Sequence, residues 1–290
     1  MDGLLDWLLD PYRFEFMRRA LAALLITSVV GSAVGAFVVN KGLSFAGDAL
    51  AHVTLAGIAI AFVAGTNVSL GALFAAVAAA LLIGFLRRHA SVTYDTAIGI
   101  IFVAGFALGL AVLSSRSTYT PNLFSFVFGD VLGVSNEDLL GELALGVGVL
   151  LFIAAFYREL LMVSFDPAMS GAAGVPRAFF EYGLLVLVAV AVVVALQLIG
   201  VVLVSAMLVV PAATGGLLAR RMSGIIALAI GCAALASVAG LHASYHAEVA
   251  TSSAVVLSSC AIFALALSGT LLARWREGVR APAARGEGGP

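Results

Sequence analysis

An acidic and an imidazole side chain stand four residues apart in the stretch Gly47-Asp48-Ala49-Leu50-Ala51-His52. The stretch opens a long apolar run, and a spacing of four places both side chains on one face of a helix. Carboxylate and imidazole are good ligands for divalent first-row metal ions. Both groups are costly inside a membrane, so they are functional candidates there. Asp48 and His52 therefore predict a metal path through the bilayer.

A plainer interpretation of the same pair is open. Asp48 could cap the start of its helix, because Asp is a preferred N-cap residue. His52 could simply bond a neighbouring backbone carbonyl. Capping explains the carboxylate, but it gives no reason for an imidazole one turn deeper in the apolar run.

Two histidines and a glutamate form a second polar set near the end of another apolar run. His242 and His246 are four residues apart, and Glu248 adds an oxygen ligand. An exposed turn whose histidines face water explains them equally well. We expect the Asp48 pair below the outer surface and this set at the outer mouth, as one shared site or as two stations.

Four other residues are candidates near the path. Asp130 could guide cations inward, or it could belong to a Gly-Asp turn. Gln197 could bond across helices. Pro211 is expected to break a helix, and Asp95 is expected to cap one at the inner surface.

The composition shows which elements must position these residues. The chain has 290 residues, of which 62% are hydrophobic and 11% are charged. Globular chains carry about 25% charged residues, so the sequence predicts an all-α integral membrane protein. The net charge of -1 leaves no basic face for nucleic acid. Cys232 and Cys260 lie in apolar runs without metal or redox spacing.

The apolar runs predict a polytopic bundle of eight or nine membrane-spanning helices within one domain, residues 20–276. Single spans are expected at 20–39, 48–65, 68–86, 95–113, 138–157, 224–242 and 252–272. The run 179–219 is roughly twice the ~20 residues that one helix needs. It is expected to turn back at Gln197–Gly200, which gives nine spans, or eight if one limb is re-entrant.

Three shorter segments complete the chain. Residues 1–19 mix aromatic and charged side chains and are expected to lie on the membrane surface. The stretch 122–134 is too short to span and is expected to be re-entrant or interfacial. The tail 277–290 is expected to be disordered and cytoplasmic.

The distribution of Lys and Arg predicts the orientation. It places the polar segment 158–178 and Lys41 in the cytoplasm, and the turn 242–248 outside. The N-terminus then lies outside together with Arg18 and Arg19, against the rule.

Several motifs are absent from the sequence. There is no Gly-x-x-x-x-Gly-Lys-[Ser/Thr], no His-Glu-x-x-His, no nucleophile elbow and no dinucleotide fingerprint. The chain is therefore not expected to be an enzyme or to bind ATP through a P-loop.

Five stretches carry a resemblance to a known family. They are 41–52 (KGLSFAGDALAH), 94–100 (YDTAIGI), 126–132 (FVFGDVL), 164–176 (SFDPAMSGAAGVP) and 195–214 (ALQLIGVVLVSAMLVVPAAT). In this order they resemble the permease subunits of ABC importers for manganese, zinc and iron, the ABC-3 group. The resemblance covers about residues 20–272 and implies a fold like that of type II ABC importers.

The resemblance implies partners and roles. Two copies of the permease pair, each docks a separate ATPase subunit on the cytoplasmic side, and an extracytoplasmic metal-binding protein delivers the ion. The family's Asp and His map onto Asp48 and His52, as metal ligands or gate residues. Segment 158–178 resembles the cytoplasmic coupling element. Its candidate residues are Phe165, Asp166, Pro167, Gly174, Val175 and Pro176.

The resemblance further implies a multi-pass protein of the prokaryotic cytoplasmic membrane, with no permanent cofactor and a transported metal. Many zinc-type members have Pro-Ser-Gly or Pro-Ala-Gly where this chain has Ala250-Thr251-Ser252-Ser253. The sequence there is closer to manganese and iron members, so we expect Mn²⁺, with Zn²⁺ and Fe²⁺ as alternatives.

Two rival functions are also open. A self-sufficient, proton-coupled secondary transporter could use Asp48 and His52 as a proton relay, but it does not explain the Pro- and Gly-bounded inner segment. An intramembrane enzyme lacks the motifs it needs.

Overall fold

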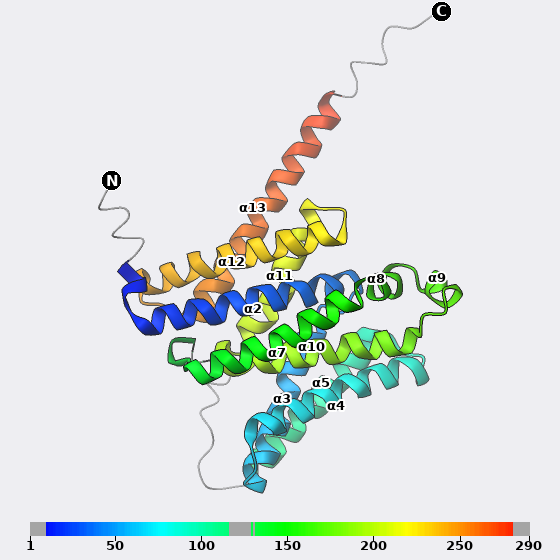
Figure 1. Ribbon diagram of the computed structural model, residues 1–290, viewed down its shortest axis with the longest axis vertical. Helices are drawn as coiled ribbons and strands as arrows, with labels where there is room; N and C mark the ends of the chain where they lie inside the picture. The colour runs from blue at the N-terminus through cyan, green and yellow to red at the C-terminus, as the bar shows by residue number, and fades with distance from the viewer. Residues whose placement is uncertain (1–9, 116–128, 130, 281–290) are drawn as a thin grey trace, which may run out of the picture.

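Long runs of Leu, Val, Ala and Ile form the helices of the protein, because a helix satisfies every backbone polar group within an apolar layer. A computed structural model describes residues 10–115, 129 and 131–280, and it is helical throughout its regular part (Figure 1). The helices are η1 (Asp10–Arg13), α2 (Glu15–Asn40), α3 (Ala46–Ala64), α4 (Val68–His89), α5 (Tyr94–Ser114), η2 (Val131–Gly133), α7 (Asn136–Ala155), α8 (Tyr157–Phe165), α9 (Pro167–Ala172), α10 (Arg177–Ile199), α11 (Val201–Leu218), α12 (Met222–Ala247) and α13 (Thr251–Arg280).

Nine helices in the described part of the chain are long and apolar enough to cross a membrane. They are α2, α3, α4, α5, α7, α10, α11, α12 and α13. The predicted all-α membrane bundle is confirmed, with nine spans rather than eight. The run 179–219 turns back at Gly200, whose φ of 80° favours glycine. Segments 1–9, 116–128 and 281–290, and Asp130, lie outside the described residues, so the expectations for them stay predictions.

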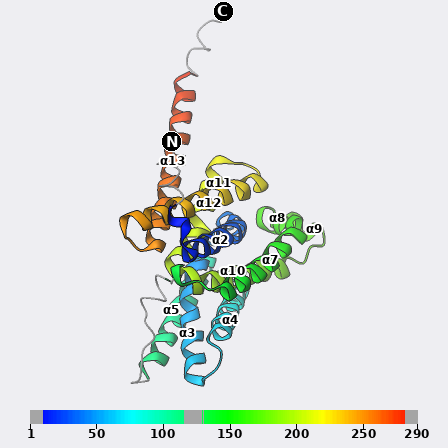
Figure 2. The same cartoon turned by 60° about the vertical axis from the view of Figure 1, so that its left-hand side comes forward.

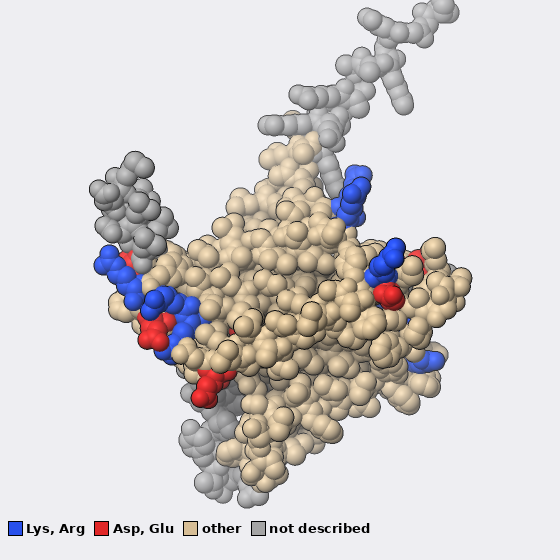
Figure 3. Space-filling model, in the orientation of Figure 1, with Lys and Arg blue, Asp and Glu red and all other residues tan. Residues whose placement is uncertain are grey.

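Charged side chains gather at two opposite ends of the bundle and leave a wide uncharged band between them (Figure 3). One charged end lies over η1 and the start of α2, and the other over α8 and α9 (Figures 1 and 3). This is the charge distribution of a protein that crosses a bilayer. We call the α8–α9 end the inner end, following the side that the Lys/Arg bias predicts.

Helix α2 lies at the centre of the bundle and is the most buried of the nine. It packs against α11, α12 and α7, while α3, α4 and α5 form a neighbouring group (Figure 2). Gly35 allows the close approach of α2 to α11, because a Cβ at this position would lie 1.9 Å from the Leu208 carbonyl oxygen. A small residue at this point thus fixes α11 against the core.

Pro211 does not break its helix, and the prediction of a break is wrong. Helix α11 continues from Val201 to Leu218 with Pro211 inside it. Proline removes one backbone donor, but neighbouring helices and hydroxyl side chains can compensate within a membrane. Here α2 packs closely against the preceding turn, and the Thr214 hydroxyl donates a 2.8 Å hydrogen bond to the Val210 carbonyl.

The inner polar segment forms two short helices joined at Asp166 (Figure 1). The Asp166 side chain caps α9 by accepting a 2.9 Å hydrogen bond from the Met169 backbone N–H. Gly174 follows α9 and has a φ of 71°. Pro176 is the N-cap residue of α10. The expected short helix with a sharp end is therefore present.

Candidate metal site

Asp48 lies in the first turn of α3 and does not cap it. The N-cap residue of α3 is Phe45, which makes no side-chain capping bond. Instead, the Ser205 hydroxyl of α11 donates a 3.1 Å hydrogen bond to Oδ1 of Asp48. The carboxylate is thus held between α3 and α11, and its side chain remains 44% exposed. Capping therefore does not account for Asp48, and an accessible oxygen ligand remains.

The ring of His52 is oriented by its own helix. Its Nδ1 lies 2.9 Å from the Asp48 backbone carbonyl oxygen, which can only accept, so Nδ1 carries the proton. In the neutral ring this bond leaves the lone pair on Nε2, and metal-binding histidines characteristically use such a bond. Within the described part of the chain, no hydrogen bond reaches Nε2. The backbone bond that offered a plain explanation of His52 also prepares it as a ligand.

Aromatic side chains of α5 hold the imidazole on its other side. Phe102 and Phe106 make edge contacts with the His52 ring, at centroid distances of 5.1 and 5.7 Å. These contacts restrict rotation of the ring and leave it only 26% exposed. The site therefore combines a fixed imidazole with a more accessible carboxylate.

A small open pocket of about 200 Å³ lies beside Asp48. Phe45, Phe102 and Asp95 line it with Asp48. Asp95 does not cap α5 as expected, because Thr93 is the N-cap and its hydroxyl accepts the Thr96 backbone N–H. Asp95 is instead a second carboxylate at the edge of the same pocket.

The pair lies nearer the Asn40 end of α2 than its Glu15 end, and its expected place below the outer surface stays a prediction. Helix α3 starts directly after the Lys41 turn, and Gly47 faces Leu208. Leu208 packs against Gly35, which is much nearer the inner end of α2 than its outer end. Most of the length of α2 thus separates Asp48 from the outer face.

The second polar set occupies the opposite end of the bundle. His242 is buried, and its Nδ1 shares a 3.1 Å hydrogen bond with the Tyr12 hydroxyl. Burial raises the pKa of Tyr12, so the hydroxyl keeps its proton. The ring centroids of His242 and His246 are 6.2 Å apart, and Glu248 ends α12 in a left-handed conformation.

The two polar sets do not meet. Among the residues that the structure describes, no group of three or more His, Cys, Asp or Glu side chains is close enough to hold a metal ion. The arrangement therefore does not bring Asp48, His52 and the His242 set into one site. Gln197 does bond between helices, by accepting a 3.3 Å hydrogen bond from the Ser69 hydroxyl of α4.

A basic cleft of about 540 Å³ opens at the inner face near α10. Its charged lining residues are Arg87, Arg88, Arg177 and Glu181. Arg177 forms a 2.8 Å ion pair with Glu181, and Lys41 lies 4.0 Å from the same carboxylate. Burial lowers the pKa of Lys41, although Glu181 acts in the opposite direction. These contacts tie the end of α2 to the start of α10, next to segment 158–178.

Sequence reasoning missed three residues that contact or resemble the candidate polar groups, namely Ser205, Phe106 and Glu142. Ser205 and Phe106 lack a signal, because only tertiary packing brings them to Asp48 and His52. Glu142 does have a signal in the sequence, since a carboxylate within an apolar span is a functional candidate by default. It is buried in α7 and accepts a 2.5 Å hydrogen bond from the Thr27 hydroxyl.

Comparison with known proteins adds to this geometry. Residues 13–269 match the family described as the ABC 3 transport family. The manganese transport system membrane protein MntC of Halalkalibacterium halodurans is 37% identical over 268 residues, which cover 91% of this chain and 92% of that protein. A probable iron transport system membrane protein of Haemophilus influenzae is 35% identical over 263 residues, with 91% and 97% covered.

A solved structure, PsaBC from Streptococcus pneumoniae in complex with Fab, has the same fold. Its matching chain is 34% identical and superimposes with a TM-score of 0.79, covering 91% of this chain and 95% of that one. Similarity thus extends over nearly the whole length, in both sequence and helix arrangement.

Proposed function

The chain belongs to the ABC 3 transport family, and from this we propose that it is the permease subunit of an ATP-driven importer that carries Mn²⁺. It is a multi-pass membrane protein and not itself an enzyme, because permeases of this family leave ATP hydrolysis to a separate subunit. Its place is the cytoplasmic membrane of a prokaryote. Manganese is favoured because relatives such as MntC carry that metal in their names, while iron stays an alternative.

The observation that carries the proposal is the geometry of Asp48 and His52. One chain offers a carboxylate oxygen and a preset Nε2, which are two ligands on adjacent turns of one helix. A divalent ion that leaves its hydration shell needs more ligands than this. The exposed side chain of Phe45 and the open pocket beside Asp48 support a partner at this position. A second copy would add a matching pair, so the path lies between two protomers.

Transport then needs two further partners. An extracytoplasmic metal-binding protein delivers the ion at the outer end, where His242, His246 and Glu248 lie, with Asp130 and Gln197 as candidate path residues. The ATPase subunit docks on α8, α9 and the turn that follows them, through Phe165, Asp166, Pro167, Gly174, Val175 and Pro176. Its motion reaches α11, and hence Pro211 and Ser205, through the packing of α10 and α2.

Reconstitution in liposomes separates this function from its rival. The permease with its ATPase and binding protein should take up Mn²⁺ only when ATP is present, and unlabelled Mn²⁺ should compete more strongly than Zn²⁺ or Fe²⁺. The permease alone should show no uptake under a pH gradient. Gradient-driven uptake by the chain alone would support the secondary transporter instead, and stronger competition by Fe²⁺ would change the assigned metal.

A further inference from the structure

Glu142 is a buried carboxyl group that the proposed metal path does not use. It lies in the second turn of α7, and only 4% of the residue is exposed. Its Oε1 accepts the Thr27 hydroxyl, while Oε2 is buried and has no hydrogen-bond partner among the described residues. Such an oxygen in a native protein demands an explanation.

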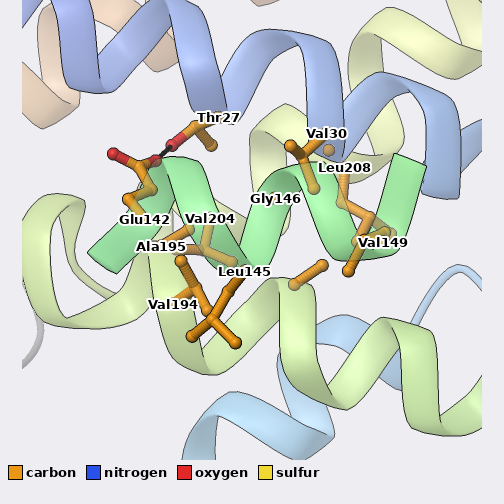
Figure 4. Close-up of a pocket in the computed structure, with 12 residues that line it drawn as sticks. Thr27, Val30, Glu142, Leu145, Gly146, Val149, Val194, Ala195, Val204 and Leu208 are labelled. Carbon is orange, nitrogen blue, oxygen red and sulfur yellow. Dashed lines mark hydrogen bonds between the residues drawn. The ribbon is translucent and has the colours of Figure 1, made fainter. Parts of the chain in front are cut away.

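The carboxyl group stands at one end of a small cavity between α2, α7, α10 and α11 (Figure 4). The cavity holds about 20 Å³, slightly more than the ~10–15 Å³ that one water molecule requires. Apart from Thr27 and Glu142, its walls are apolar, including Val194, Ala195 and Val204. Among the described residues, no cluster of oxygen ligands lies there to hold a metal ion.

No cation in the described structure compensates a negative charge on Glu142. On α2, Glu15 pairs with Arg19 nearer the outer end, and Arg18 is exposed. On α7, Asp138 and Ser135 bond one another. The walls from α10 and α11 carry no charged group. An isolated carboxylate in such surroundings is far more costly than a neutral acid with one unused oxygen.

We propose that Glu142 and Thr27 form a proton-binding site, in which Glu142 is a neutral carboxylic acid in the conformation described. The ligand is a proton from the outer side, since α7 begins at that face and Glu142 lies about 9 Å along the helix from Asn136. The site is separate from the ion path and does not require that protons drive transport.

The position of the site links its proton to α11. Val204 and Leu208 form part of the cavity wall, while Ser205, between them, binds Asp48 on another face of the same helix. Loss of the proton would draw water or a cation into the cavity and displace these wall residues. Proton occupancy therefore stabilises the α11 packing that also holds Asp48. This link, unlike the site itself, depends on the proposed function.

Infrared difference spectroscopy of the purified permease complex tests the site without any transport assay. At neutral pH, subtraction of the Glu142→Gln spectrum from the wild type should leave the carbonyl stretch of a protonated carboxyl group. Glu137→Gln, at the exposed start of α7, should leave only ionised carboxylate bands. A wild-type spectrum in which Glu142 contributes only carboxylate bands would overturn the proposal.

Two other measurements cover the case in which Glu142→Gln fails to fold. A hydrophobic carbodiimide reacts with protonated carboxyl groups in apolar surroundings, so it should label Glu142 of the wild type in preference to Glu137, as read by mass spectrometry of peptides. The wild-type melting temperature should fall as pH is raised and should not depend on added Na⁺ or K⁺. Absence of labelling at Glu142 would overturn the proposal. A wild-type melting temperature that one of these cations raises, with no such rise in the Glu142→Gln variant, would show a bound cation instead of a proton.

Discussion

The Ser205 hydroxyl donates a 3.1 Å hydrogen bond to Asp48 and so joins α11 to the first turn of α3. These residues lie far apart in the sequence, and the bond fixes one oxygen of the carboxylate while the other stays available. Since α11 also packs against α2 through Gly35, movement in the core can reach the proposed ligand directly. The Ser205–Asp48 hydrogen bond therefore connects the proposed metal path to the bundle core.

Ser205→Ala should lower metal uptake without preventing assembly. Loss of a group that orients a metal ligand characteristically costs about 10- to 100-fold in affinity or activity, and we expect the lower end because Asp48 is partly exposed. ATP-driven Mn²⁺ uptake by the reconstituted complex measures the effect.

Ser268→Ala is the matched control, because the Ser268 hydroxyl bonds only within α13, to the Leu265 carbonyl. Equal uptake by the Ser205→Ala variant and the wild type would mean that the bond does not position the ligand.

Gly35→Ala should destabilise the bundle. Its new Cβ would lie 1.9 Å from the Leu208 carbonyl oxygen, so α2 and α11 would have to move apart. Overpacking of this kind costs about 1–3 kcal/mol. Thermal unfolding in detergent should show a lower melting temperature for this variant. Gly141→Ala, where a Cβ meets no atom within 4 Å, should leave it unchanged, and equal melting temperatures for the two variants would argue against the close contact.

Much of the fold could be predicted because it follows from length and hydropathy. The run 179–219 is too long for one helix, so a turn near Gly200 could be expected, while the choice between eight and nine spans needed the structure. Pro211 misled the prediction, because a helix packed closely against a neighbour, as α11 is against α2 at Gly35, can continue through a proline.

The candidate site was less predictable than the fold. The spacing of Asp48 and His52 identified the pair and its helix face. Their depth could not be read from the sequence, because it depends on how α3 leaves the Lys41 turn and packs against α11. Asp95 joins Asp48 at one pocket through the packing of α3 on α5, which no local pattern reports.

Asp166→Ala should weaken coupling to the ATPase while leaving the membrane bundle intact. The side chain caps α9, and loss of such a cap costs about 1 kcal/mol. Metal-dependent stimulation of ATP hydrolysis in the reconstituted complex should fall, with the melting temperature of the bundle unchanged.

Asp166→Asn retains a capping oxygen and should restore the stimulation. If Asp166→Asn were as defective as Asp166→Ala, the carboxylate charge rather than the cap would be the important property. Normal stimulation in both variants would remove α9 from the coupling route.

The most direct test of the metal path compares wild type, Asp48→Ala and His52→Ala in ATP-driven Mn²⁺ uptake by the whole reconstituted complex. Removal of either ligand should lower uptake by at least ~10-fold, while the permease still copurifies with its ATPase and the basal ATP hydrolysis persists. Wild-type uptake by both variants would contradict the assignment of Asp48 and His52 to the path.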